Sequence, residues 1–164
     1  MGWDEVLSGA FWIRLAIALG CGGAIGFERQ LRGKPAGMRT SMLVCLGTLL
    51  YVRLGASFTT AHADPTRVLG QVVTGIGFLA AGVILTRGGQ VVGITSAAVM
   101  WVLAAVGAAV ALDHLGAAIA TTATTVAILV GLNLVEHAFT SMQRGVHSQS
   151  DAETENRYSG PWGP

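Results

Sequence analysis

The chain reads Gly26-Phe27-Glu28-Arg29-Gln30-Leu31-Arg32-Gly33-Lys34-Pro35-Ala36-Gly37-Met38-Arg39-Thr40 between two long apolar segments. We call residues 26–40 the basic strip, since they hold three arginines and one lysine but a single acid, Glu28. Each flanking segment is long enough to cross a bilayer, so the basic strip is predicted to be a short loop at a membrane face. Cytoplasmic loops are enriched in Lys and Arg, and we therefore expect this loop inside the cell.

The composition also indicates a membrane protein. Of the 164 residues, 52% are hydrophobic and only 12% are charged. A soluble domain typically carries about 25% charged residues. The formal net charge is +1, and we expect no nucleic-acid partner. The lipid bilayer is predicted to surround most of the chain.

Five apolar segments approach or reach the length of about 20 residues that a helix needs to cross the hydrocarbon core. They cover approximately residues 7–27, 40–58, 68–86, 93–112 and 115–135. The sequence thus predicts an all-α membrane protein, a bundle of five transmembrane helices with the N-terminus outside the cell and the C-terminus in the cytoplasm. We assign residues 1–140 to this membrane domain. Residues 141–164 form a polar cytoplasmic tail that is predicted to be disordered, because it lacks any apolar period.

One arginine lies inside each of the first two predicted spans. At 1.5 Å per residue, Arg14 and Arg53 are both about 21 Å from the basic strip, in the outer third of the membrane. Two interpretations stay open. Either the side chains extend to the nearby interface, or they face the bundle interior and bind acids at the outer side, namely Asp4, Glu5 or Asp64.

The third predicted span has a clear start and a polar face. Asp64 can cap exposed backbone N–H groups, and Pro65 suits the first helical position. Polar, glycine and aromatic residues then recur at spacings of three and four, which places them on one face of a helix. We expect this face to contact other helices rather than lipid. Its residues are Arg67, Gln71, Thr74, Gly75, Phe78 and Gly82.

Small residues in the spans favour close helix packing. Gly22 and Gly26 have the GxxxG spacing, and the fourth span is rich in alanine. Gly75, Gly77 and Gly82 are the corresponding candidates in the third span. These residues serve packing within the chain or a contact between subunits, and we expect a homodimer.

The sequence predicts that the protein is not an enzyme and has no cofactor, and it offers no recognisable metal-binding motif. The glycine pattern at residues 75–80 lies within a predicted span instead of following a strand, so it is not a dinucleotide-binding loop. No Asp or Glu falls inside the predicted spans, whereas Mg²⁺ requires oxygen ligands and usually a carboxylate. Glu28 and Asp64, at the predicted faces, are the remaining metal candidates.

Three motifs in order resemble the N-terminal membrane domain of the MgtC/SapB family. They are the basic strip, the segment from Asp64 to Gly82, and Gly93-Ile94-Thr95-Ser96-Ala97-Ala98 followed by Trp101. The resemblance covers roughly residues 15–112. It implies a bacterial inner-membrane protein that serves adaptation to magnesium limitation and, in pathogens, virulence. It further implies a regulator of other membrane proteins such as the F-type ATP synthase, although the family is often labelled a Mg²⁺ transporter.

Two functions of different classes remain. The first is a regulator that packs its small-residue helices against another membrane protein. The second is a transporter or channel, with the basic strip at its inner mouth and the third span lining a path. The candidate functional residues are Glu28, Arg29, Pro35, Gly37, Arg39 and Thr40 of the basic strip, together with Asp64, Arg67, Gln71 and Thr74. For Glu28 and Arg29 the alternative to a binding role is that they form a loop pair held at the lipid headgroups.

Overall fold

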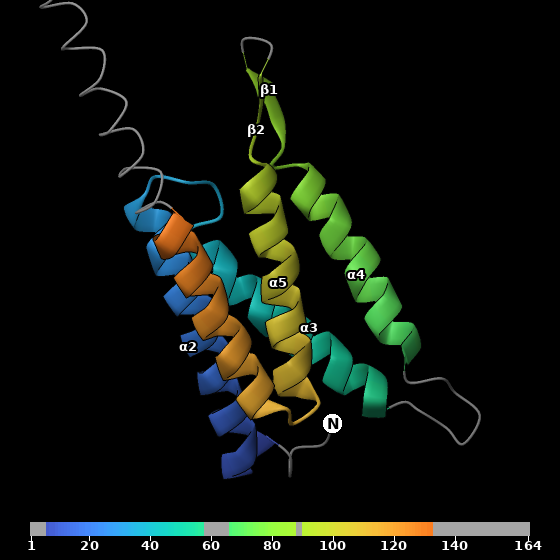
Figure 1. Cartoon of the computed structure of the whole chain (residues 1–164). Coiled ribbons are helices and arrows are strands. Elements are labelled where there is room, and N and C mark those ends of the chain that lie inside the picture. The colour runs from blue at the N-terminus through green and yellow to red at the C-terminus, as the bar shows by residue number, and fades with distance from the viewer. Residues whose placement is uncertain (1–5, 58–65, 88–89, 133–164) are drawn as a thin grey trace, which may run out of the picture. The chain divides into compact units, whose positions relative to one another are not determined.

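The computed structural model describes residues 6–57, 66–87 and 90–132, and Figure 1 shows their arrangement. Within these ranges the chain forms five helices and one β-hairpin. The packing described below belongs to the unit Met1–Ala127; the described residues of the second unit, Ile128–Pro164, are the last turn of one helix. Four of the five helices are long and apolar enough to cross a membrane, which confirms the expectation of a helical membrane protein. Several of the predicted features, including Asp64 and the tail 141–164, lie outside the described residues.

The first described helix, α2, runs from Gly9 to Leu31 and is longer than predicted. The side chain of Ser8 caps its start by accepting a hydrogen bond from the Phe11 backbone N–H. Its last turns include Glu28 and Arg29, so the expectation that the whole basic strip is a loop was wrong. The connection to the next helix, α3 (Met38–Ser57), is only residues 32–37.

Helices α2 and α3 pack closely at two glycines. A Cβ atom at Gly22 would lie 2.8 Å from the Ser41 carbonyl oxygen, and one at Gly26 would lie 2.6 Å from the Met38 Cα. Real carbon atoms pack at about 3.5–4.0 Å, so a side chain at either position would push the helices apart. The GxxxG pair of the first span therefore serves packing within the chain.

Helix α5 (Ile94–Ala111) is the central element of the unit Met1–Ala127. It contacts α2, α3 and α4. Of the residues in its 18-residue apolar stretch, 56% are buried, against 33% for the corresponding stretch of α2 and 28% for that of α3. A Cβ atom at Gly107 would lie 2.5 Å from the Cys45 carbonyl oxygen of α3. Around these contacts lie the largest buried side chains of the core, Ile25, Leu49, Leu103, Val106 and Val110.

The third predicted span is shorter than expected. Helix α4 runs from Thr66 to Ala81, and a β-hairpin follows instead of further helix (Figure 1). Its strands are β1 (Leu85–Arg87) and β2 (Gln90–Val92), paired antiparallel with Leu85 opposite Val92. Gly93 closes the hairpin at φ +95°, where a Cβ atom would lie 2.2 Å from the Val83 carbonyl oxygen. Only glycine fits this position.

The polar face of α4 is largely exposed in the described structure, and only Gln71 and Gly75 of it line a groove shared with α3, which differs from the expectation that the whole face contacts other helices. Gln71 and Thr74 are exposed, and Phe78 is 81% exposed. The buried side of α4 consists of Ile76 and Ala80. Near Gly75 and Gly77 a Cβ atom would meet nothing within 4 Å, and at Gly82 the nearest atom belongs to the adjacent turn of its own chain.

A tight turn joins α5 to the helix Leu115–Leu132. Asp113 adopts the left-handed conformation at φ 63°, which Asp tolerates better than most residues. The backbone N–H of His114 donates to the Ala109 carbonyl, so the turn also satisfies the end of α5. The bounds of α5 agree with the predicted span 93–112.

Candidate functional site: a buried charged cluster and an apolar groove

A charged cluster is buried where α2 ends. Glu28 is 7% exposed and Arg29 is 3% exposed, so the interpretation as a loop pair at the lipid headgroups was wrong. The Arg29 Nη2 donates a 2.6 Å hydrogen bond to the Oγ of Ser96, which is 2% exposed on the first turn of α5. This bond ties the end of α2 to the start of α5.

The carboxylate of Glu28 pairs with the Arg32 Nε through its Oε1 atom. Apart from this ion pair, neither Oε atom of Glu28 has a hydrogen-bond partner among the described residues. The same is true of the Arg29 Nε. One carboxylate thus lies among two guanidiniums, and the cluster keeps unused hydrogen-bonding capacity in a buried place, which is costly unless a further group satisfies it.

The connection 32–37 is fixed by two polar side chains that the sequence had not singled out. The Gln30 Oε1 accepts a hydrogen bond from the Met38 backbone N–H, at 3.3 Å. Ser41, fully buried, donates from Oγ to the Ala36 carbonyl, at 3.2 Å. Of the predicted strip residues, Pro35, Arg39 and Thr40 are exposed and Gly37 is half-buried. They therefore lie outside the buried cluster.

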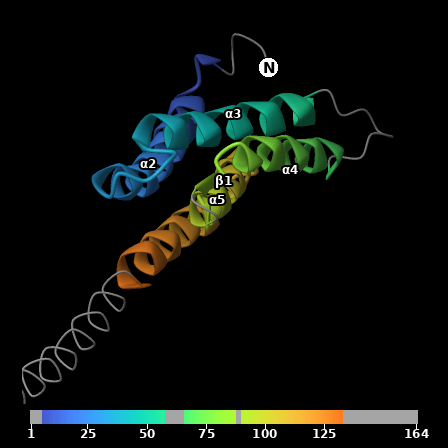
Figure 2. The ribbon, with the colours of Figure 1, turned by 90° about the horizontal axis from the view of Figure 1, so that it is seen from above.

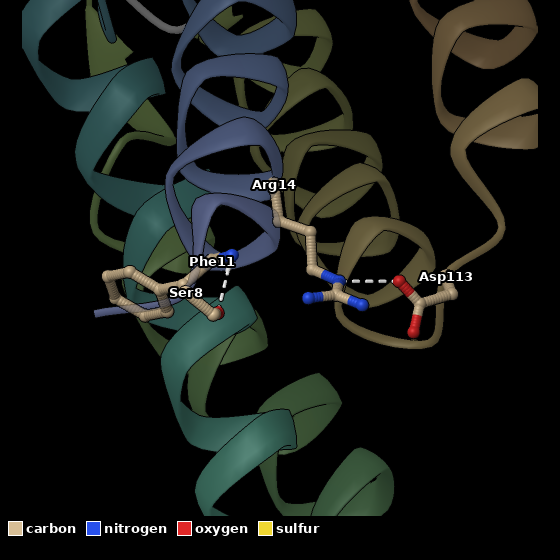
Figure 3. A network of polar contacts seen from close by, with 4 residues as sticks. All are labelled: Ser8, Phe11, Arg14 and Asp113. Carbon is tan, nitrogen blue, oxygen red and sulfur yellow. Dashed lines mark hydrogen bonds and ion pairs between the residues drawn. The ribbon is translucent and has the colours of Figure 1, made fainter. Parts of the chain in front are cut away.

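An ion pair joins two distant parts of the chain at the opposite end of α2. The Arg14 Nε donates to the Asp113 Oδ1 at 2.5 Å, and Figure 3 shows the guanidinium pointing toward the turn that follows α5. The hydrogen bond from Arg14 lowers the pKa of Asp113, and the charge of Arg53 contributes less in the same direction. The expected partners Asp4, Glu5 and Asp64 lie outside the described residues, and the partner found is Asp113.

An apolar groove of about 640 Å³ lies between α3 and α4, which run side by side in Figure 2. Thr40 and Gln71, two of the predicted site residues, line it together with Gly75. Arg67 is exposed on the first turn of α4, and Thr74 donates from Oγ1 to the Gly70 carbonyl of its own helix. Of the predicted site residues, Glu28 and Arg29 therefore belong to the charged cluster and Thr40 and Gln71 to the groove, whereas the other described ones belong to neither.

No group of three or more His, Cys, Asp or Glu that could hold a metal occurs within residues 6–57, 66–87 and 90–132. The cluster around Glu28 was predicted only in part. Ser96 belongs to the third motif quoted above, but no role could be given to it from the sequence. Its partner Arg29 lies 67 residues earlier in the chain.

Comparison with known proteins places these features in a family. The family described as MgtC family matches residues 15–138. "Putative magnesium transporter YhiD" of Escherichia coli (strain K12) is 44% identical over 108 residues, which are 62% of this chain and 50% of that protein. "Protein MgtC" of Brucella abortus (strain 2308) is 48% identical over 93 residues, 57% of this chain and 39% of that protein.

A third relative aligns over more of the chain. "Protein MgtC" of Salmonella paratyphi A (strain ATCC 9150 / SARB42) is 36% identical over 155 residues, 94% of this chain and 64% of that protein. The chain spans about half the length of the first curated relatives it matches. No solved structure matches the chain significantly.

Proposed function

Because this chain belongs to the MgtC family, we propose that it helps a bacterial cell adapt to magnesium limitation by binding and regulating another protein of the inner membrane. Three of its relatives carry names that refer to magnesium or to MgtC, and its long apolar helices are those of a membrane protein. The F-type ATP synthase is the first candidate partner, by family resemblance.

The observation that carries this proposal is the outward side of α4. Gly70, Thr74, Gly77 and Ala81 follow one another at spacings of four, three and four, so they share one face of the helix, and all four are exposed. We call this face the α4 seam. In lipid, helices associate through small residues that let their backbones approach closely. Since Cβ atoms at Gly70 and Gly77 would meet nothing within 4 Å, the seam is open to a partner helix.

The test is crosslinking in living cells followed by growth. A photoreactive amino acid replaces Thr74 in the full chain, and a matched one replaces Ala24, which is exposed on α2. We expect the Thr74 position alone to capture one defined membrane protein, and we expect Gly70→Leu to abolish both this capture and growth at low magnesium. Gly20→Leu is the control, because Gly20 also has open space around it. Normal growth of the Gly70→Leu strain would refute the proposal.

The same experiment tests subunit association. A second copy of the chain captured at Thr74 would assign the seam to the homodimer that the sequence predicts. In that case the regulated protein must bind elsewhere, and the proposed use of the seam fails.

A second candidate function is transport of Mg²⁺. It is favoured by the name of the Escherichia coli relative, "Putative magnesium transporter YhiD", and by the buried carboxylate of Glu28, whose Oε2 has no hydrogen-bond partner among the described residues. Purified protein in liposomes that contain a Mg²⁺-sensitive dye tests it directly. Flux that exceeds that of protein-free liposomes and disappears in Glu28→Gln would support transport, whereas flux equal to that of empty liposomes would exclude it.

The orientation belongs to the same proposal. We place the connection 32–37 in the cytoplasm and the turn at Asp113 outside the cell. Both native cysteines of the described chain, Cys21 and Cys45, are buried, so a single new cysteine can be labelled selectively. In intact cells an impermeant thiol reagent should label Asp113→Cys and not Lys34→Cys. The opposite pattern would invert the topology.

A further inference from the structure

We propose that the groove between α3 and α4 binds an anionic phospholipid, with an acyl chain along the groove and the phosphate beside Arg39 and Thr40. This inference goes beyond the proposed function and does not depend on it. It concerns a different side of α4 from the α4 seam.

The length of the groove matches one leaflet of a bilayer. Its wall on α3 extends from Thr40 to Tyr51, and its wall on α4 extends from Val68 to Leu79. Each wall therefore covers eleven residue steps, or about 16 Å of helix. The hydrocarbon core of a bilayer is about 30 Å thick, so one leaflet contributes about 15 Å. A chain that belongs to one leaflet can lie along the whole groove.

The depth of the groove comes from glycines on both walls. Gly47 of α3 and Gly75 of α4 line it, and a Cβ atom at either would meet nothing within 4 Å. Between them the walls are formed by aliphatic and aromatic side chains such as Leu43, Val72 and Leu79. Such a surface is suited to hydrocarbon and offers few hydrogen-bonding groups.

Charge at one end of the groove indicates an anionic headgroup. Arg39 is exposed and precedes Leu43 by four residues on α3, so it extends the groove-lining face by one turn. The hydroxyl-bearing Thr40 lines the same end. Lys34 is exposed in the adjoining connection, and the nearby acid Glu28 is already paired with Arg32. A phosphate at this end would meet an arginine and a hydroxyl, which are its usual partners.

The length of the groove favours a lipid over a membrane-spanning helix of another protein. Such a helix crosses about 30 Å of hydrocarbon, whereas the groove extends along only about 16 Å of α3 and α4. An acyl chain of one leaflet has a length that matches the groove.

Native mass spectrometry of the full chain in detergent tests the proposal. Phosphatidylglycerol or phosphatidylcholine with identical acyl chains is added, and bound lipid is counted. We expect wild-type protein to retain phosphatidylglycerol over phosphatidylcholine. Arg39→Gln should lower this preference about fivefold, the effect of one basic residue at an anionic headgroup. Arg67 is exposed four residues before the groove-lining Gln71, at the other end of the groove, so Arg67→Gln tests which end holds the phosphate. It should leave the preference unchanged, and a loss in Arg67→Gln without one in Arg39→Gln would overturn the placement of the headgroup.

Filling the groove should remove lipids of both kinds. Gly47→Leu and Gly75→Leu place side chains in it from opposite walls, whereas Gly20→Leu adds the same side chain in open space on α2. Circular dichroism selects the variants that fold, and Arg39→Gln gives a result even if neither leucine variant does. Undiminished phosphatidylglycerol binding in folded groove variants, or in Arg39→Gln, would overturn the proposal. Loss of a dimer mass with unchanged lipid would instead assign the groove to a second copy and also overturn it.

Discussion

Replacing Ser96 with alanine should destabilise the protein by about 2–3 kcal/mol, because a buried hydrogen bond to a charged group contributes about 1.5–3 kcal/mol. The Ser96 Oγ accepts a 2.6 Å bond from the guanidinium of Arg29, and both residues are almost fully buried. In the variant the Nη2 donor loses this acceptor, beside an Nε that already lacks a partner among the described residues.

The free energy of unfolding is measured by a denaturant titration in detergent micelles, followed by far-ultraviolet circular dichroism. Ser57→Ala is the control, because Ser57 is exposed and its Oγ donates to the Leu54 carbonyl of its own helix; its change should stay within about 0.5 kcal/mol. A double-mutant cycle with Arg29→Met isolates the pair, and coupling of about 0.5–3 kcal/mol is expected. A Ser96→Ala effect no larger than that of the control, or zero coupling, would refute the role assigned to this bond.

Three further predictions follow from the fold. Gly26→Ala should lower the melting temperature in detergent, since overpacking costs about 1–3 kcal/mol and the gain in helix propensity is at most about 1 kcal/mol. Gly20→Ala, in open space, should raise the melting temperature or leave it unchanged. Equal shifts of the melting temperature in the two variants would contradict the contact between α2 and α3. Gly93→Ala should cost about 2–5 kcal/mol, from left-handed strain plus a steric overlap, and should make the hairpin sensitive to limited proteolysis; an unchanged digestion pattern would count against the described turn. The pKa of Asp113 is lowered in the folded state, so its ion pair stabilises the protein above the unfolded pKa of about 3.9 and is lost as the pH falls through the folded value. The stability difference between wild type and Asp113→Asn, at most about 1 kcal/mol for so exposed a pair, should therefore stay constant from about pH 5 to 8 and disappear only in strong acid.

The apolar segments were sufficient to predict α2, α3 and α5, because a long run of such residues has few alternatives in a membrane. They were not sufficient for residues 82–92. Apolar, β-branched residues such as Val83 and Ile84 suit a buried helix and a strand equally, and the signal that separates the two was the requirement for glycine at position 93. That requirement becomes visible only when the Val83 carbonyl is seen next to it.

The residues of the candidate site could be predicted from the sequence, but their spatial arrangement could not. Glu28 and Arg29 were selected from the basic strip, yet a charged pair in a short segment between spans is normally exposed, and nothing local indicates burial. The guanidinium of Arg29 can be buried because it donates a hydrogen bond to Ser96, which comes from another helix. Likewise the partner of Arg14 is Asp113, 99 residues away. Pairings of this kind depend on how the helices pack, which local sequence does not specify.

The hairpin β1–β2 sets a limit on how deep the molecule sits in its bilayer. Among the described residues these two strands pair with each other alone, which leaves outer rows of backbone amides and carbonyls, and hydrocarbon offers these groups no partners. Leu85 and Val92, which face each other at the base of the hairpin, therefore mark the depth at which the hydrocarbon of the bilayer must end. Spin labels placed one at a time at the positions from Ala81 to Leu85 should change from oxygen-rich to water-rich surroundings. The position of that change would fix how deep each helix lies in the bilayer.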